Sequence, residues 1–123
     1  IDLTVYLLTQ RMRDEGQAPH QLSHASATAL WWTPAQMVTH HTVGGCELRP
    51  GDLIGTGTVS MANGQDSGCL LEMTEGGNKP ILLPNGESRA FLQDGDQVIM
   101  RGSCHREGYV SIGFGECTGV VQG

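Results

Sequence analysis

The stretch Ile1-Asp2-Leu3-Thr4-Val5-Tyr6-Leu7, at residues 1–7, alternates apolar side chains with others along the chain. Successive side chains of a strand point to opposite faces of a sheet, so the apolar set is expected on one face. That set is Ile1, Leu3, Val5 and Leu7. We expect a strand over residues 1–13 that becomes irregular at 11–16, and then a polar loop with one short strand over 17–28.

One helix is predicted near residues 34–43. Thr33 is a good N-cap, Pro34 suits the first helical turn, and Gln36 completes a capping box. Gly44 and Gly45 supply a stop at the other end. These signals bracket a helix of about ten residues.

The remainder of the chain predicts strands. Short apolar runs alternate with turn residues, and the expected strands lie at 52–60, 68–74, 81–83, 97–102, 109–114 and 119–122. The turns between them contain Pro, Gly, Asn and Asp, which suit turn conformations. The 18 glycines are about twice the usual share. We therefore expect a mainly β domain over residues 1–123 with one short helix near 34–43.

Composition argues against two classes of partner. Thirteen acidic residues against seven Lys and Arg give a formal net charge of −6, and the basic residues are scattered. Binding of phosphate backbones requires clustered positive charge, so no nucleic-acid partner is expected. The apolar runs are far shorter than the roughly 20 residues that span a bilayer, so no membrane partner is expected.

The cysteines and histidines predict no metal site in this chain. Cys46, Cys69, Cys104 and Cys117 include no Cys-x-x-Cys pair, which favours reduced thiols in a cytoplasmic protein, with disulfides as the alternative. His20 and His24 lack a helical pattern around them. His40 and His41 are adjacent and point in different directions on a helix, so we place them in its last turn, near the carbonyls that end it.

The chain begins at Ile1, already inside an alternating segment. A natural N-terminus rarely starts in this way. We therefore expect the 123 residues to be part of a longer polypeptide.

The glycine-rich stretch Gly51-Asp52-Leu53-Ile54-Gly55-Thr56-Gly57-Thr58 superficially resembles a phosphate-binding loop. It lacks the Lys-Ser/Thr ending and a following helix, which argues against nucleotide binding. Glycines in a strand let a ligand approach the backbone, and Thr56 or Thr58 then offers it a hydroxyl. The alternative, which composition alone favours, is a bulged core strand.

Glu72 lies in Leu70-Leu71-Glu72-Met73, which we expect to be a strand. A carboxylate there either faces solvent or is held in a cleft by a partner. The sequence pattern alone favours a solvent-facing side chain.

Seven segments read together resemble one known family. They are residues 32–41, 45–53, 56–60, 70–73, 79–81, 91–99 and 113–117. In these segments, which extend over nearly the whole chain, the sequence closely resembles the fumarylacetoacetate hydrolase family. Gly-Asp-Leu-Ile and Thr-Gly-Thr occur across that superfamily. Thr-His-His, Leu-Glu-Met and Gly-Phe-Gly-Glu-Cys are similar to its fumarylacetoacetase branch.

The resemblance implies a C-terminal portion of a mixed β-sandwich roll and a homodimeric protein. It implies hydrolysis of a carbon–carbon bond in a 1,3-diketo acid, fumarylacetoacetate, giving fumarate and acetoacetate in tyrosine and phenylalanine degradation. It also implies a divalent cation, magnesium or calcium, which polarises the diketo oxygens. The acidic ligands of that cation lie upstream of this sequence in the family, so no metal ligand is assigned here.

Two site residues are carried over from the resemblance. In the family a glutamate orients a histidine, and the histidine takes a proton from the attacking water. Glu72 matches that glutamate, as a catalytic residue, and Thr58 matches a threonine that binds substrate. We expect the two side chains on the same side of one concavity, from two different strands. The family's histidine lies upstream, so we expect the isolated chain to be inactive.

Two alternatives remain open. An acylpyruvate-type hydrolase or decarboxylase of the same superfamily shares the Gly-Asp-Leu-Ile and Thr-Gly-Thr elements, although the long segment 81–123 argues against it. A non-catalytic β module for oligomerisation or ligand binding is the other alternative, and it accounts for the missing metal ligands.

Overall fold

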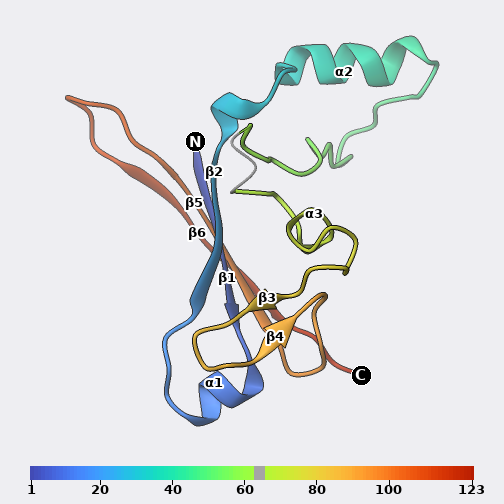
Figure 1. The fold of residues 1–123 in the computed structure, drawn as a ribbon. Helices are drawn as coiled ribbons and strands as arrows, with labels where there is room; N and C mark the ends of the chain where they lie inside the picture. The colour runs from blue at the N-terminus through green and yellow to red at the C-terminus, as the bar shows by residue number, and fades with distance from the viewer. Residues whose placement is uncertain (63–65) are drawn as a thin grey trace.

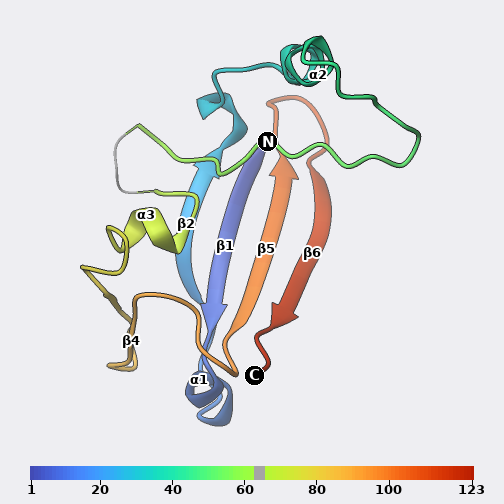
Figure 2. The ribbon, with the colours of Figure 1, turned by 90° about the vertical axis from the view of Figure 1, so that its right-hand side faces the viewer.

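The computed structural model describes residues 1–62 and 66–123. Its main element is a four-stranded antiparallel sheet in the order β2-β1-β5-β6, seen face on in Figure 2. The strands are β1 (Asp2–Leu8), β2 (His20–Ser26), β5 (Gln97–Cys104) and β6 (Ile112–Val120). A two-stranded sheet pairs β3 (Ile81–Leu82) with β4 (Ser88–Arg89). The prediction of a mainly β fold is confirmed.

Strand β1 lies between β2 and β5 in the sheet. Val5 pairs with Met100 of β5 on one side and with Ser23 of β2 on the other. Leu7 is fully buried. On the opposite face the guanidinium of Arg101 stacks over the Tyr6 ring, 5.0 Å from its centroid. Leu7 and Tyr6 thus lie on opposite faces of the sheet, as the alternation predicts.

The strand predicted over residues 1–13 is wrong in its second half, where helix α1 (Gln10–Asp14) follows β1. Thr9 is its N-cap, and its hydroxyl oxygen accepts a hydrogen bond from the Met12 amide (3.1 Å). This bond satisfies one of the free amides at the start of a helix. Thr9 is the local signal that the strand prediction overlooked.

Two other strand predictions differ from the structure: one predicted strand is too short, and one strand was predicted as two. The polar segment 17–28 contains strand β2 of seven residues rather than a short strand in a loop, and a 3₁₀ turn follows at Ala27–Ala29. The strands expected at 109–114 and 119–122 are one continuous strand, β6. Strand β6 continues across its glycines because its backbone hydrogen bonds to β5, rather than its side chains, keep it extended.

Helix α2 (Pro34–Val43) forms where the sequence predicts it. Thr33 and Gln36 make the reciprocal capping box, and Gly44 ends the helix. The expectation of a single helix is wrong, since the described residues contain three α-helices: α1, α2 and α3 (Leu70–Met73). None of the helices in residues 1–62 and 66–123 has the length and apolar character needed to cross a bilayer.

Two predicted strands are absent. The segment 52–60 is irregular, because Gly51 and Gly57 adopt positive φ angles of 96° and 77° that interrupt an extended chain. The segment 68–74 contains helix α3 instead of a strand. Leu, Glu and Met all have good helix propensity, and a four-residue apolar run does not distinguish helix from strand.

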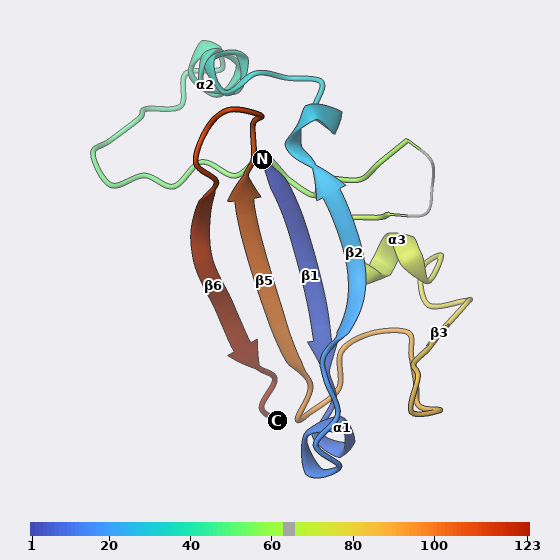
Figure 3. The same cartoon turned by 90° about the vertical axis from the view of Figure 1, so that its left-hand side faces the viewer.

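The elements outside the large sheet gather on one side of it. Figure 1 shows α2, α3 and the β3–β4 hairpin on the same side of the sheet, and Figure 3 shows the opposite face bare. The residues that face the covered side include Leu3, Val5 and Met100, which line a hollow with the segment 56–59. The candidate site described below lies beside this hollow.

The most tightly packed part lies near α1 and β4, at the bottom of Figure 1. Leu7, Met12 and Leu83 are buried there, at 2% exposure or less. Arg89 and Asp96 are also buried, and two hydrogen bonds join them: Nε to Oδ2 (2.8 Å) and Nη2 to Oδ1 (3.0 Å). A buried charge is stable only with such partners.

The chain exposes an unusually large surface. Its accessible area is 8658 Å², whereas a self-contained protein of this mass is expected to expose about 6,400 Å². Large apolar side chains contribute to the excess, among them Trp31 (89% exposed) and Leu53 (97%). Apolar surface of this extent usually contacts another part of a protein.

Candidate functional site

The structure brings Glu72 and Thr58 into direct contact. The Thr58 hydroxyl donates a hydrogen bond to Oε1 of Glu72 (3.1 Å). Glu72 belongs to helix α3 and Thr58 to the irregular segment before it, so the prediction that each lies on a strand is wrong. Their contact is compatible with the predicted shared concavity, which stays a prediction.

Two further side chains hold the same carboxylate. The Ser60 hydroxyl donates to Oε2 (2.5 Å), and the Cys69 thiol lies 3.5 Å from Oε1 as a weak donor. The sequence analysis missed both residues. The spacing Thr58-x-Ser60 was the available signal for Ser60, since two hydroxyls two residues apart in an extended segment can reach one group.

These hydrogen bonds stabilise the ionised form of Glu72. Those from Ser60 and then from Thr58 hold the pKa of the Glu72 carboxyl below its ordinary value, because they stabilise the ionised form. The side chain is exposed, so solvent or another protein group can reach it. Glu72 is therefore an accessible anion at neutral pH.

Gly68 permits the close approach of the two segments that build the site. A Cβ atom at this position would lie 2.8 Å from both the backbone N and O of Val59, and 2.9 Å from the Thr58 Cβ. Real Cβ atoms essentially never come so close to backbone atoms. Only glycine fits at position 68 without a shift of the segment that carries Thr58 and Ser60.

The site borders two open hollows over the covered face of the sheet. One, of about 520 Å³, is lined by Thr58, Gly68, Val5 and Met100 among others. The second, of about 510 Å³, is more apolar and is lined by Cys69, Leu70, Phe91 and Met100 among others. Gly68 and Met100 line both hollows, so the two adjoin beside the Glu72 cluster. Glu72 itself is at their border and lines neither.

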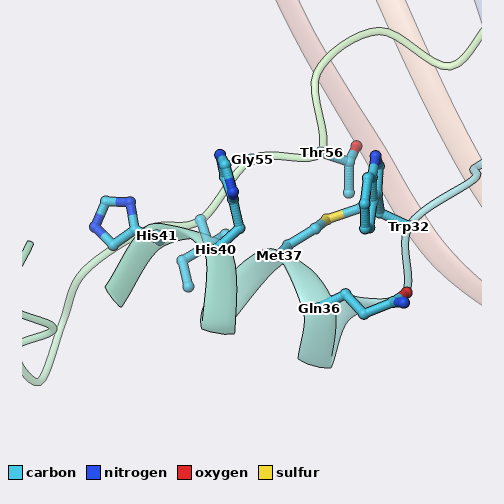
Figure 4. Close-up of a pocket in the computed structure, with 8 residues that line it drawn as sticks. Trp32, Gln36, Met37, His40, His41, Gly55 and Thr56 are labelled. Carbon is cyan, nitrogen blue, oxygen red and sulfur yellow. The ribbon is translucent and has the colours of Figure 1, made fainter. Parts of the chain in front are cut away.

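A separate hollow of about 360 Å³ lies between α2 and the segment 54–56. Figure 4 shows Trp32 and Met37 side by side and His40 directed toward Gly55. His41 points away from them in the same view. His40 and His41 are in the last turn of α2, as predicted. No hydrogen bond to Glu72 comes from this helix within the part of the chain that the structure describes.

The described residues do not fit a metal site. Within 1–62 and 66–123, no group of three or more His, Cys, Asp or Glu side chains gathers closely enough to hold an ion. The described residues therefore supply no set of ligands for the divalent cation that the family resemblance implies. The four cysteines are free thiols.

Comparison with known proteins agrees with the resemblance. The family model described as fumarylacetoacetate (FAA) hydrolase C-terminal matches residues 9–122. Fumarylacetoacetase of Arabidopsis thaliana is 54% identical over 92 residues, which are 75% of this chain and 21% of the plant protein. The Homo sapiens protein of the same name is 51% identical over 92 residues, 75% of this chain and 22% of its own length.

A longer match is found with fumarylacetoacetase of Dictyostelium discoideum, at 40% identity over 123 residues. It covers 98% of this chain and 28% of the relative. The chain thus spans about a quarter of the length of the curated relatives it matches. The family match extends over most of the 123 residues, so this chain belongs to the fumarylacetoacetate hydrolase family and represents its C-terminal region.

Proposed function

We propose that the full-length protein carrying this chain hydrolyses the carbon–carbon bond of fumarylacetoacetate, giving fumarate and acetoacetate. In this proposal the chain contributes the Glu72 carboxylate and the Thr58 hydroxyl to the active site. The observation that carries it is the Glu72 cluster, in which an accessible carboxylate accepts hydrogen bonds from the Thr58 and Ser60 hydroxyls. The relatives named fumarylacetoacetase support the choice of substrate.

An ionised carboxylate is suited to orienting a histidine. It accepts the N–H of one ring nitrogen, which fixes the tautomer, and it stabilises the imidazolium that forms during catalysis. We assign that histidine to a part of the full-length protein outside these 123 residues, as the family resemblance implies. Glu72 then acts on the reaction through the base that it orients.

The reaction balances with water as the only co-reactant. The histidine takes one proton from water as the water oxygen bonds to a carbonyl carbon of the diketo acid. The carbon–carbon bond to the acetoacetate part then breaks, and its electron pair remains on the departing carbon. Protonation of that carbon gives acetoacetate, and the carbon that received the oxygen becomes a carboxylate of fumarate.

We assign Thr58 a contact with the substrate in addition to its hydrogen bond to Glu72. Its side chain is exposed and lines the hollow over the sheet face. A hydroxyl rotates about its C–O bond and has both a donor and acceptor sites, so it can serve a ligand and the carboxylate in turn. Loss of this hydroxyl should therefore weaken substrate binding.

The proposal extends to the setting of the enzyme. It includes a homodimer, a magnesium or calcium ion held by residues of the longer protein, and a cytoplasmic location. The large exposed apolar surface supports contact with further protein, and the four free thiols are typical of a reducing compartment.

The test is the turnover of two substrates by the full-length protein, supplied with magnesium or calcium. We expect fumarate and acetoacetate in equal amounts from fumarylacetoacetate, and little reaction with an acylpyruvate. Preference for the acylpyruvate would favour that branch of the superfamily instead. If the folded protein turns over neither substrate, the non-catalytic β module becomes the better account.

The isolated 123-residue chain is the matched control. Because Glu72 needs a histidine that the proposal places elsewhere, the chain alone should show no hydrolysis above buffer with either cation. Measurable turnover by the isolated chain would show that the base lies within these residues.

A further inference from the structure

Ser60 connects the Glu72 carboxylate to the backbone. Its hydroxyl donates to Oε2 of Glu72 (2.5 Å), and its oxygen accepts from the backbone N–H of Gly68 (2.8 Å). A serine hydroxyl has one donor and two acceptor sites, so both bonds form at once. The amide of Gly68 thus fixes the direction in which Ser60 presents its proton.

The two oxygens of Glu72 are held differently. Oε1 receives both the Thr58 hydroxyl and the Cys69 thiol. Among the described residues, Ser60 is the one side chain that donates to Oε2. The last torsion of a glutamate is broad, so a carboxylate held at one oxygen can still rotate. Contact at Oε2 restricts that rotation.

The backbone reinforces this bridge. Gly68 lies so close to Val59 that a Cβ atom would meet its backbone N and O at 2.8 Å. The segment that carries Ser60 and the residues just before α3 are therefore in close contact. The Gly68 amide and the Glu72 carboxylate both reach Ser60 across this contact.

We propose that Ser60 is a positioning residue for hydrolysis, which sets the orientation of the Glu72 carboxylate and, through it, that of the catalytic histidine. The inference rests on the function proposed above for Glu72. Ser60 acts in it without touching the substrate. Its removal should therefore impair chemistry more than substrate binding.

The test is a double-mutant cycle in the full-length protein with Ser60→Ala, Glu72→Gln and the double variant. Loss of a hydrogen bond to a charged group should lower kcat about tenfold in Ser60→Ala, with little change in KM. Ser60→Thr keeps the hydroxyl and should recover most of kcat. If Ser60 acts through Glu72, the double variant should match Glu72→Gln alone.

The pKa of Glu72 supplies a readout that a purely structural role would not move. The hydrogen bond from Ser60 lowers the pKa of Glu72, so its loss should let that pKa rise. Carboxyl NMR titration of the full-length protein should show this rise directly in Ser60→Ala. Ser88→Ala is the matched control, because Ser88 is exposed on β4 and its side chain forms no hydrogen bond within the described residues.

Three outcomes separate the two proposals. If the effects of Ser60→Ala and Glu72→Gln multiply in the double variant, Ser60 acts independently and this inference is wrong. If Glu72→Gln alone leaves kcat unchanged, the function proposed for Glu72 fails. In that case carboxyl NMR titration of Glu72 still tests the bridge, since Ser60→Ala should raise its pKa, and an unchanged pKa would contradict the inference.

Discussion

The region around α1 and β4 and the region around α2 use polar groups in opposite ways. In the first, the Arg89 side chain is 8% exposed and the Asp96 side chain 1%, and they pair with each other. In the second, every residue from 31 to 58 is exposed except Met37. Its polar contacts, such as the capping box of Thr33 and Gln36, join residues close in sequence.

This difference shows which contacts stabilise tertiary structure and which only shape a segment. Arg89 also bonds Glu87 (3.2 Å), and Glu87 accepts the Thr9 hydroxyl (2.5 Å) from a position 78 residues away. The network therefore ties α1, the β3–β4 hairpin and the turn before β5 together. Among the described residues, the side-chain hydrogen bonds of α2 join it only to its own residues and its N-cap.

The largest effect is expected at Arg89. Replacement by alanine leaves Asp96 buried without its cation, and breaking a buried pair typically costs about 3–5 kcal/mol. Native-state hydrogen exchange of the full-length protein measures this at the Val121 amide, which bonds Asp96 O (2.9 Å). The control is Arg49→Ala, whose pair with Glu47 is about three-quarters exposed and should contribute about 0–1 kcal/mol. Equal losses of stability in Arg89→Ala and Arg49→Ala would contradict the difference proposed between the two regions.

A smaller, pH-dependent effect is expected at Glu87. Hydrogen bonds from Thr9 and then Asn85 hold the pKa of Glu87 below its ordinary value. A carboxyl with a lowered folded pKa stabilises the fold above its unfolded pKa of about 4.3, and this stability is lost as the pH falls through the folded pKa. Protection of the Val121 amide should therefore weaken on going from about pH 7 to about pH 3.

Glu87→Gln isolates this contribution. The variant should lose about 1–3 kcal/mol of local stability at neutral pH, because a charged acceptor becomes neutral. Its protection should then depend less on pH than that of the parent protein. The same acid sensitivity in parent and variant would assign the effect to another carboxylate.

The smallest effect is expected at the cap of α2. Thr33→Ala should cost about 1 kcal/mol of local stability at the Met37 amide, which bonds Thr33 O (3.0 Å). Val121 protection should not change, because the cap contacts nothing near it. Thr39→Ala is the control, since its hydroxyl bonds only Ala35 O within its own helix. A change at Val121 in Thr33→Ala would show that α2 is coupled to the sheet.

The parts that the sequence predicted are those with local signals. Thr33, Gln36 and Gly44 define α2 within a dozen residues, and the alternation at residues 1–7 defines β1. The network of Arg89, Asp96 and Thr9 has no local signature, because Thr9 reaches Glu87 from 78 residues away and Asp96 reaches Arg89 across a turn. The strands expected at 52–60 and 68–74 failed because short apolar runs do not determine their own conformation.

The candidate site was predicted in part. Glu72 and Thr58 were assigned from family resemblance, and the structure places their side chains 3.1 Å apart. Their catalytic and substrate-binding roles stay predictions. Ser60 was missed because the spacing Thr58-x-Ser60 has meaning only once the chain folds back at Gly68, where the absence of a side chain permits the contact.

The most direct test of the account is Glu72→Gln in the full-length protein, measured as kcat and KM for fumarylacetoacetate. The amide keeps the shape of the side chain but loses the charge that would orient a histidine and stabilise its protonated form. We expect kcat to fall by roughly 10²–10⁴ with little change in KM. Thr58→Val provides the contrast and should raise KM at least as much as it lowers kcat. Near-normal kcat in Glu72→Gln would contradict the account and make Glu72 an ordinary exposed residue of α3.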